Sequence, residues 1–235
     1  TLTFGYFNKG LKTGHWRWYN EGSVLDMTGY FNDGKQDSIW HYYFSSGEIS
    51  YIAHFNKGKR TGEWNYFYQN GASYRKGNYL NDQREGNWQT WYEDGVLLMN
   101  GQYEQGKEEG VWYNYWENGA LKNKAEFKHG LMNGEWLSYT PESILSNAGK
   151  YKKGYKVGAW YTYYNNGRLK EKVNYKVFTE TNVTNDMAIM GLKETVSDYH
   201  GKFEAYSQKD FQLKAEGTYR KGMKHGKWID YYPGG

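Results

Sequence analysis

Apolar and polar positions along the chain recur with a period of 24 residues. The period is marked by a row of tryptophans, which Phe203 and Trp228 continue after one interruption. The members of the row are Trp16, Trp40, Trp64, Trp88, Trp112, Trp136 and Trp160. Repeats of this length are typical of arrays in which each unit buries its hydrophobic face against its neighbours. The sequence therefore predicts about nine copies of one structural unit stacked in a row.

Glycine and aromatic residues hold fixed places around each tryptophan, which we call the anchor. Two residues before the anchor stands glycine, with Ser38 as the one exception, and six before it glycine recurs in most copies. Three residues after the anchor the residue is always aromatic: Tyr19, Tyr43, Phe67, Trp91, Tyr115, Tyr139, Tyr163, Tyr206 and Tyr231. A further aromatic column lies nine residues before the anchor. Such columns indicate that one backbone geometry is reused in every copy.

Each copy is predicted to be a β-hairpin. Residues 73–79 and 86–92 are too short and too rich in glycine for helices, and their aromatic residues favour strands. Between copies stand dipeptides that are typical of tight turns, for which we expect positive φ at both residues. They are Asn70-Gly71, Asp94-Gly95, Asn118-Gly119 and Asn166-Gly167. Pro141 falls five residues after an anchor, where the strand should have ended.

The two faces of the predicted sheet should differ. In a strand, the anchor and the aromatic residue three places later point to opposite faces. We therefore expect one face to carry the tryptophans as a core and the other to carry a partly exposed row of mostly tyrosines. Aromatic residues four places after the anchor should return to the anchor's face.

The fold class predicted is all-β: an elongated, solenoid-like array of stacked antiparallel hairpins. Residues 1–175 hold the repeats from Trp16 to Trp160, residues 176–198 are an insertion, and residues 199–235 hold two further repeats. We expect one continuous elongated domain. Within the insertion, residues 186–190 could form a helical turn or an extended hairpin. The insertion as a whole is the predicted specificity element, because repeat proteins place functional additions in loops.

Composition supports a folded chain of unusual core chemistry. Aromatic residues make up 20% of the sequence, against 38% for all hydrophobic residues, and the mean hydropathy is −1.02. Disordered chains are poor in aromatic residues, whereas this one has 11 Trp and 26 Tyr. The net charge of +4 is too small to indicate nucleic-acid binding. Cysteine is absent, and no apolar run reaches the roughly 18 residues of a spanning helix.

No residue pattern predicts catalysis, a cofactor or a metal. Residues 29–35 and 101–107 spell G-x-x-x-x-G-K, but a phosphate loop needs Ser or Thr next, and here Gln36 and Glu108 follow. The six histidines lack metal-ligand spacing, and no pair of carboxylates is favoured for glycoside hydrolysis. We therefore expect no catalytic, cofactor-binding or metal-binding residues, no cofactor, and no enzymatic activity.

Two surface features remain as binding candidates beside their plainer interpretations. Exposed tyrosines could form a platform for sugar, peptide or protein, although most aromatic residues should be core. Basic residues near the glycine turns could attract an anionic membrane or partner, although such charges are usually only solvated. They are Lys57, Lys59 and Arg60, then Lys152, Lys153 and Lys156, and then Arg220, Lys221, Lys224 and Lys227.

The repeat resembles a known family. Residues 101–112 look like the G-x-[YWF]-x-x-G-x-x-x-G-x-G pattern of MORN (membrane occupation and recognition nexus) repeats, with Trp112 in place of the final glycine. This version is similar to the bacterial variant repeat of the YwqK-family antitoxin type, and the resemblance covers the chain except about 176–198. It implies scaffolding, partner binding or lipid association, and the antitoxin name implies neutralising a toxin by binding.

The function expected is a non-enzymatic scaffold for protein–protein interaction, an accessory or structural part of a bacterial assembly. The alternatives are a module for glycans or anionic lipids, contacting a membrane peripherally, and an antitoxin. Asp37-Ser38-Ile39 resembles the O-glycosylation acceptor of exported Bacteroidota proteins, and this resemblance slightly favours the cell envelope as the expected location. Because the chain begins at Thr1, we expect that it was processed or excised from a longer protein.

Overall fold

The computed structural model describes residues 2–180 and 194–232, and every regular element in these ranges is a β-strand. The all-β fold class predicted from the repeat is therefore confirmed. The chain divides into two compact units, residues 1–119 and 120–235. The expectation of one continuous elongated domain stays a prediction. Residues 186–190 lie outside the described residues.

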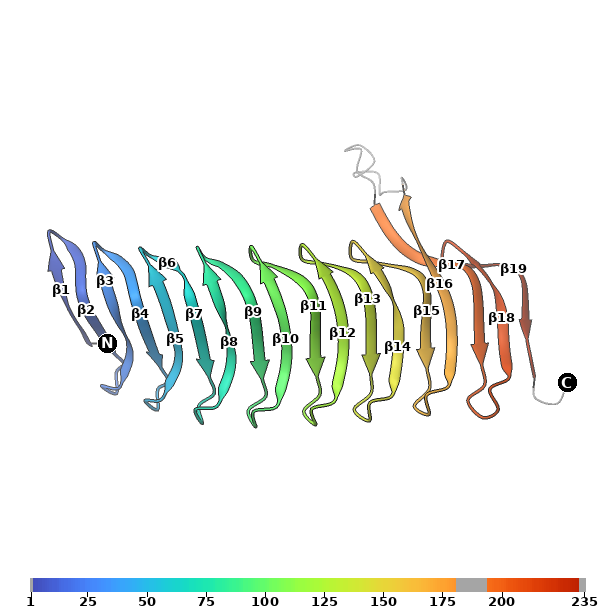
Figure 1. Cartoon of the computed structure of the whole chain (residues 1–235), viewed down its shortest axis with the longest axis horizontal. Coiled ribbons are helices and arrows are strands. Elements are labelled where there is room, and N and C mark those ends of the chain that lie inside the picture. Colours follow the sequence, from blue (N-terminus) through green and yellow to red (C-terminus); the bar gives the residue numbers. More distant parts are fainter. Residues whose placement is uncertain (1, 181–193, 233–235) are drawn as a thin grey trace. The chain divides into compact units, whose positions relative to one another are not determined.

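Unit 1 is a meander of antiparallel strands, each paired with the next along the chain (Figure 1). β6 is a short strand that pairs with the end of β5. The strands are β1 (Leu2–Asn8), β2 (Leu11–Tyr19), β3 (Leu25–Asn32), β4 (Lys35–Tyr43), β5 (Ile49–Asn56), β6 (Lys59–Arg60), β7 (Gly62–Phe67), β8 (Ser73–Leu80), β9 (Gln83–Trp91), β10 (Leu97–Glu104) and β11 (Lys107–Tyr115).

Unit 2 repeats the same plan. Its strands are β12 (Leu121–Lys128), β13 (Leu131–Tyr139), β14 (Leu145–Lys152), β15 (Tyr155–Tyr163), β16 (Leu169–Glu180), β17 (Glu194–Tyr206), β18 (Leu213–Arg220) and β19 (Met223–Asp230). β16 and β17 are longer than the others and remain paired as far as Glu180 and Glu194. The described flanks of the insertion thus extend one hairpin.

Two kinds of turn alternate along each unit. The turn within a repeat has positive φ at both central residues, as at Lys57 (50°) and Gly58 (84°). Such turns match the twist of the flanking strands. Between repeats the turn is longer: the N–H of Gly71 donates to the carbonyl of Tyr68, and only Gly71, not Asn70, has positive φ. The expectation of positive φ at both residues of the Asn-Gly and Asp-Gly pairs was therefore wrong.

Asn70 stabilises the longer turn in another way. Its side-chain oxygen accepts the N–H of Ala72 at 2.9 Å, as an Asx turn does. Asp94 and Asn166 accept the N–H two residues later in the same manner. Pro141 also lies in this turn, outside the strands, as predicted.

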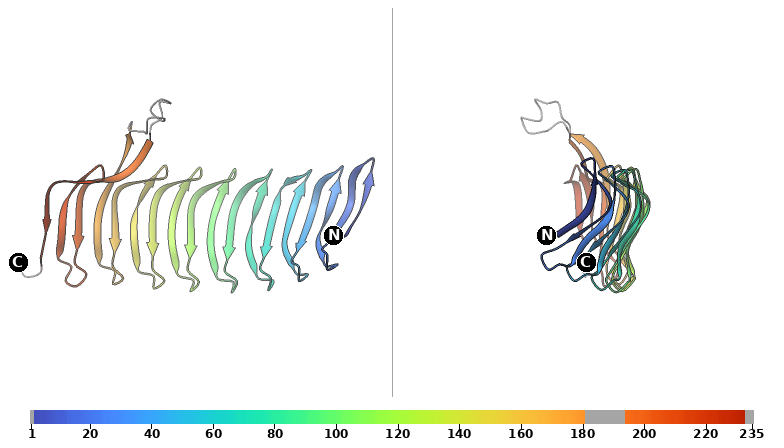
Figure 2. Two further views of the ribbon diagram at one scale, coloured as in Figure 1. Left: turned by 180° about the vertical axis from the view of Figure 1, so that it is seen from behind. Right: turned by 90° about the vertical axis from the view of Figure 1, so that its left-hand side faces the viewer.

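The core of most repeats is an indole that lies on a glycine. On β3, Gly29 faces the ring of Trp40, and a Cβ atom at Gly29 would stand 2.0 Å from Trp40 Cδ2. The pairing of β3 and β4 shifts at this point, so that three residues of β4 oppose the single residue Gly29. A bulge of this kind bends the strand, and the strands of both units are curved along their length (Figure 2).

Burial confirms that the tryptophans form the core. Six of the anchors are at most 7% exposed: Trp16, Trp40, Trp64, Trp88, Trp112 and Trp160. Trp136 and Trp228 are half-buried. The glycine column beneath them, eleven residues before the anchor, was not singled out from the sequence, although Gly5, Gly29, Gly77 and Gly101 follow the 24-residue period. In this column Ala53, Ala125 and Val173 replace glycine.

In several repeats the indole that covers the bulge also forms a hydrogen bond to it. Trp88 Nε1 donates to the carbonyl of Asn78 at 3.1 Å, and Trp64 Nε1 donates to the carbonyl of His54 at 3.2 Å. For Trp40, Trp64, Trp88, Trp160 and Trp228 the acceptor lies ten residues before the donor, next to the covered glycine or alanine, whereas Trp16 Nε1 donates to the carbonyl of Thr13. A buried carbonyl without a partner would destabilise the fold. Tryptophan therefore supplies both the apolar surface and the missing donor, which Phe at the anchor could not do.

Candidate functional site

Each unit is a single layer of strands and so presents two faces, which we call the Trp face and the opposite face. On the Trp face, cationic side chains lie over the rings. Lys12 Nζ is 4.6 Å from the centre of the Trp16 ring, and Lys156 Nζ is 4.3 Å from that of Trp160. Burial lowers the pKa of Lys156. The long stems of these residues shield the rings in the absence of a second layer.

This arrangement divides the predicted stripe of basic turn residues. Arg60, Lys156 and Lys224 do not belong to the turns, because each covers an aromatic ring of the Trp face. Arg60 also forms an ion pair with Asp82 at 3.4 Å. The remaining members are exposed and stand at or beside the turns or, for Lys227, in β19: Lys57, Lys59, Lys152, Lys153, Arg220, Lys221 and Lys227. The cation column over the rings was missed in the sequence, although it recurs four residues before the anchors.

The row of the Trp face beside the anchors changes character along the chain. In unit 1 the cross-strand partners in this row begin with aromatic residues, such as Tyr42, Tyr51 and Tyr66. Tyr42 and Tyr51 stack at 4.0 Å between ring centres. In unit 2 the row is polar, and Asn147 pairs with Thr162. The anchor column is nearly constant, so this row is one of those in which the copies differ on the Trp face.

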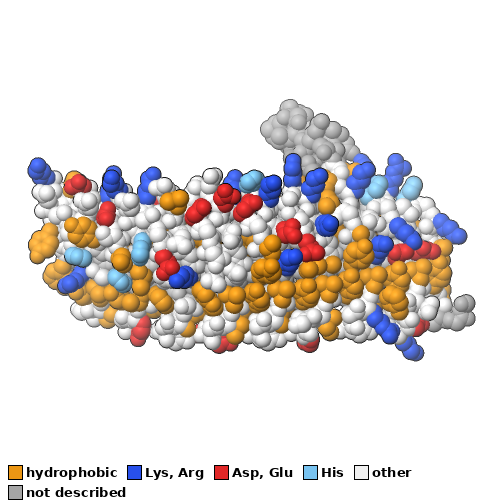
Figure 3. All heavy atoms as spheres, in the orientation of Figure 1, with side chains coloured by type: hydrophobic (Ala, Val, Ile, Leu, Met, Phe, Trp, Pro, Cys, Tyr) orange, Lys and Arg blue, Asp and Glu red, His pale blue; other side chains and the backbone are white. Residues whose placement is uncertain are grey.

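The opposite face carries an apolar band near the longer turns. The aromatic residues three places after the anchors are half-buried there, except the exposed Tyr231, as expected for a partly exposed row. Most of them have an aliphatic cross-strand partner: Tyr19 with Leu25, Tyr43 with Ile49, Trp91 with Leu97, Tyr139 with Leu145, Tyr163 with Leu169, and Tyr206 with Leu213. We call this set the aromatic–aliphatic band, and Figure 3 shows hydrophobic side chains gathered in such a band across the strands of each unit.

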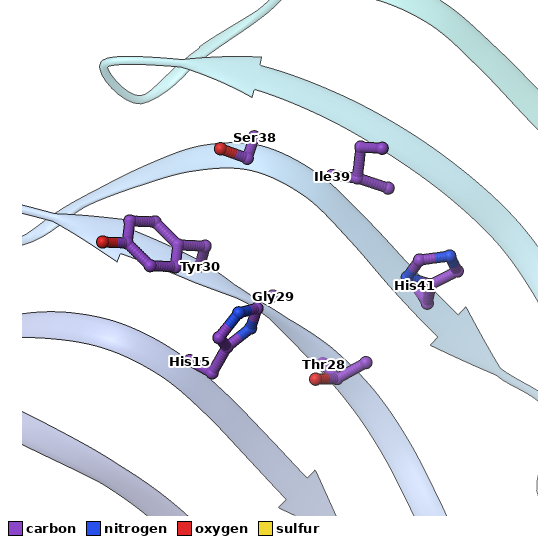
Figure 4. A pocket seen from close by; sticks show the side chains of 7 residues that line it. All are labelled: His15, Thr28, Gly29, Tyr30, Ser38, Ile39 and His41. Carbon is purple, nitrogen blue, oxygen red and sulfur yellow. The ribbon is translucent and has the colours of Figure 1, made fainter.

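A shallow hollow of about 440 Å³ opens on the opposite face of β2, β3 and β4. Its walls include His15, Tyr30, Ile39 and His41, which surround the backbone at Gly29 (Figure 4). His15 and Tyr30 meet edge to face at 5.3 Å. The hollow therefore combines apolar walls with imidazole and phenol groups that can exchange hydrogen bonds with a ligand. The sequence showed these histidines but gave no sign that the fold brings His15 and His41 to one hollow.

Ser38 also lines the hollow and departs from the repeat. Its φ is 59°, a conformation that the other copies occupy with glycine, and its side chain is exposed. Ser38 Oγ lies 3.1 Å from Asp37 Oδ1. A serine in the left-handed region is strained relative to glycine. Ile39, the next residue, is 48% exposed. The resemblance of residues 37–39 to a glycosylation acceptor thus falls on an exposed position.

Neighbouring repeats are joined by hydrogen bonds beyond the strand ladders. The hydroxyl of Tyr68 donates to the carbonyl of Trp91 at 2.8 Å, and that of Tyr92 donates to the carbonyl of Tyr115 at 3.0 Å. At the other edge, the N–H of Gly58 donates to the carbonyl of Gln36 at 2.7 Å. These contacts make each repeat a support for the next. The sequence showed the aromatic column four places after the anchor, but it did not predict that the tyrosine hydroxyls of this column bond to the next repeat.

The remaining sequence candidates fall on ordinary elements of the repeat. Residues 29–35 and 101–107, which resemble a phosphate loop, form strand–turn–strand segments. Within the described ranges, no group of three His, Asp or Glu residues is placed to hold a metal ion. In the same ranges, no helix has the length and hydrophobicity needed to cross a bilayer.

Comparison with known proteins finds one family model that matches part of the chain. Residues 84–105, 108–129 and 156–176 match the family described as MORN repeat variant, and each segment contains one anchor. No curated protein matches the chain. Among solved structures, the crystal structure of TcdB2-TccC3-TEV aligns with 97% of this chain and 15% of its own length, at 9% identity and a TM-score of 0.25. That of TcdB2-TccC3 aligns with 91% of this chain and 15% of its own length, at 12% identity and a TM-score of 0.16.

Proposed function

Taking the chain as a MORN-repeat protein of the variant type, we propose that it is a non-enzymatic scaffold whose aromatic–aliphatic band binds a protein partner. The band is the observation that carries the proposal, because it recurs through both units on a face that no second layer covers in the described residues. Contiguous apolar patches on soluble proteins mark interaction sites, and aromatic residues are enriched in interfaces.

The proposal that the chain is not an enzyme rests on the repeat itself. The positions that vary between copies are spread along a single-layer sheet and do not converge on one point, as a reaction would need. A scaffold needs only a long rigid surface, and stacked hairpins provide one. An accessory role in a bacterial assembly is the form of this function that we favour, and the partner is a protein of that assembly.

The test is partner recovery with variants of the band. Leu97→Thr and Leu145→Thr, combined in one chain, remove two aliphatic members of the band while keeping strand-forming residues. A matched control, Lys76→Thr with Lys124→Thr, changes two ion-paired lysines outside the band, one exposed and one half-buried. We expect crosslinking in the native cells to recover a partner with the parent chain and the control, and to lose it with the band variant. Equal recovery by all three chains would remove the band as the binding surface.

A glycan is the second candidate ligand, and the hollow lined by His15, Tyr30 and His41 favours it. Sugars present both apolar C–H faces and hydroxyls, which match aromatic walls with polar edges. A glycan array probed with the parent chain and with Tyr30→Ala tests this function. Binding that survives the substitution, or no binding to any glycan, would exclude the hollow as a sugar site.

Anionic lipid is a third candidate, favoured by the exposed turn cations Lys152, Lys153, Arg220 and Lys221. Each cation near such a surface contributes roughly 1 kcal/mol. Flotation with phosphatidylserine vesicles, compared with phosphatidylcholine vesicles, tests it.

Toxin neutralisation, which the antitoxin-like repeat suggests, is one form of protein binding. It is tested by co-expressing the chain with the toxic product of a neighbouring gene, and failure to rescue growth would exclude it.

A further inference from the structure

Oxidisable aromatic rings follow one another without a gap along the Trp face of unit 1. From Trp64 the series continues through Tyr79, Trp88 and Tyr103 to Trp112, with ring centres 5.1, 5.2, 6.0 and 5.0 Å apart. Tryptophan and tyrosine can lose one electron to form a radical, whereas phenylalanine cannot do so under comparable conditions. Rings in van der Waals contact allow an electron to pass between neighbours.

Phenylalanine interrupts this alternation at two places in unit 1, and at both an additional ring bypasses it. Phe31 stands between Trp16 and Trp40, and there Trp18 lies 5.7 Å from the first and 5.5 Å from the second. Phe55 likewise stands between Trp40 and Trp64. The bypass residue belongs to the variable row beside the anchors.

Around Phe55 the bypass consists of two tyrosines. Tyr42 lies 6.1 Å from Trp40, Tyr51 stacks on Tyr42 at 4.0 Å, and Tyr51 lies 6.1 Å from Trp64. In the copy whose aromatic column holds Tyr103, the corresponding positions carry Thr90 and Met99, whereas Tyr66 occupies such a position beside Tyr79. In unit 1, aromatic residues of the variable row thus keep the oxidisable series continuous past Phe31 and Phe55.

Unit 2 repeats the relationship with different residues. Here Phe203 replaces an anchor, and Tyr199 occupies the place that a lysine holds over Trp16 and Trp160. Tyr199 lies 4.9 Å from Tyr175 and 5.0 Å from Tyr219, which in turn lies 5.1 Å from Trp228. The series from Trp136 to Trp228 is therefore continuous as well, through Tyr151, Trp160 and Tyr175.

A core selected only for apolar packing would have no reason to restore this continuity, because phenylalanine packs as well as tyrosine. We propose that each unit carries single-electron vacancies along its Trp face, and so moves oxidising equivalents from one place on the surface to another. The activity goes beyond scaffolding and does not depend on which partner the chain binds.

The electron balance of this activity is simple. A one-electron oxidant, such as trivalent ruthenium polypyridyl, takes an electron from an indole and becomes divalent. The next ring donates one electron to the oxidised indole, so the vacancy moves on while no covalent bond forms or breaks. An oxidised tyrosine releases its phenolic proton to a hydrogen-bonded oxygen or to water and regains it on reduction. A soluble reductant such as ascorbate supplies the final electron.

The test uses the absence of cysteine from the chain. Lys12→Cys provides a single attachment point beside Trp16 and Trp18, whose rings Lys12 covers. The full-length chain carries a ruthenium photo-oxidant there, is flashed with a sacrificial electron acceptor present, and is then digested. Mass spectrometry measures the oxygenated products at each tryptophan. The same complex left unattached serves as the control for oxidation from solution.

We expect the attached oxidant to produce oxidation at Trp64 and Trp88 in the parent chain. Tyr51→Phe keeps the ring but cuts the bypass, so oxidation at these two residues should be lost while that at Trp40 remains. Tyr66→Phe is the matched control, because Tyr66 contacts Tyr51 and Trp64 as a side branch. Adding Phe55→Tyr to the Tyr51→Phe chain should restore oxidation at Trp64, since Phe55 lies 5.3 Å from it.

Circular dichroism keeps these results interpretable by showing that every variant retains its fold. Distal oxidation that is equal in the parent and Tyr51→Phe chains would overturn the proposal. Failure of Phe55→Tyr to restore it would do the same. Should Tyr51→Phe prove unstable, Tyr42→Phe cuts the same bypass one ring earlier and carries the same expectation.

Discussion

The indole of Trp88 lies against Gly77 so closely that a Cβ atom at Gly77 would stand 2.1 Å from Trp88 Cδ2. Gly77→Ala should therefore displace the indole and lower the free energy of unfolding by about 1–3 kcal/mol, as overpacking of a core does. Urea denaturation followed by Trp fluorescence measures the change. Gly71→Ala makes no such contact, and its effect reports the strain of positive φ alone, which Gly77 does not have. A Gly77→Ala chain as stable as the parent would show that the indole moves freely.

Ser38 occupies a left-handed conformation that glycine holds in the other copies. We expect Ser38→Gly to raise the free energy of unfolding by about 1 kcal/mol, because it relieves backbone strain. The reverse change at the same place in another copy, Gly86→Ser, should lower it by a similar amount. Thermal denaturation of both variants checks the prediction, which fails if the two changes have the same sign.

The hydroxyl of Tyr92 donates to the carbonyl of Tyr115 at 3.0 Å and so joins two successive repeats. Tyr92→Phe removes this donor and should lower the free energy of unfolding by about 0.5–1.5 kcal/mol. Tyr232→Phe is the control, since Tyr232 is 81% exposed. Chemical denaturation of the two variants should separate them, and equal stabilities would mean that the bond contributes nothing.

Alkaline pH should weaken the fold through its half-buried phenols. Burial raises the pKa of Tyr42, Tyr51 and Tyr151 above the ordinary 10.0. Above about pH 10 the unfolded chain therefore loses protons that the folded chain retains, and stability falls as the pH rises. Urea denaturation at about pH 8 and about pH 10.5 measures this effect. Tyr51→Phe should reduce the pH dependence, and an unchanged slope would contradict the assignment.

The hairpin repeat could be predicted because it is written in the 24-residue period of the anchors and in columns such as the aromatic residues after Trp40 and Trp64. The turns between repeats could not be assigned from their dipeptides, because Asn70 bonds to the N–H of Ala72 and keeps a negative φ. The turn type, and with it the sign of φ at the first residue of the pair, depends on the length of the loop, which a dipeptide does not show.

Less of the candidate surfaces than of the fold could be predicted from the sequence. Arg60 and Lys156 looked like members of one basic stripe with Lys57 and Lys153, and only the register of the strands places the first two over rings. The hollow depends on three strands that bring His15 and His41 to one face. Neither relationship follows from spacing along the chain, because both depend on the bulges that shift the pairing.

The bond from the N–H of Gly58 to the carbonyl of Gln36 spans one repeat, as do its counterparts at Gly34 and Gly106. A hairpin excised at its turns would leave the hairpins on either side able to form the same bond with each other. Gene segments encoding one hairpin can therefore be duplicated or deleted by unequal crossing-over without creating a faulty junction. Lineages can change the reach of such a protein by whole hairpins, while point mutation alters its faces independently.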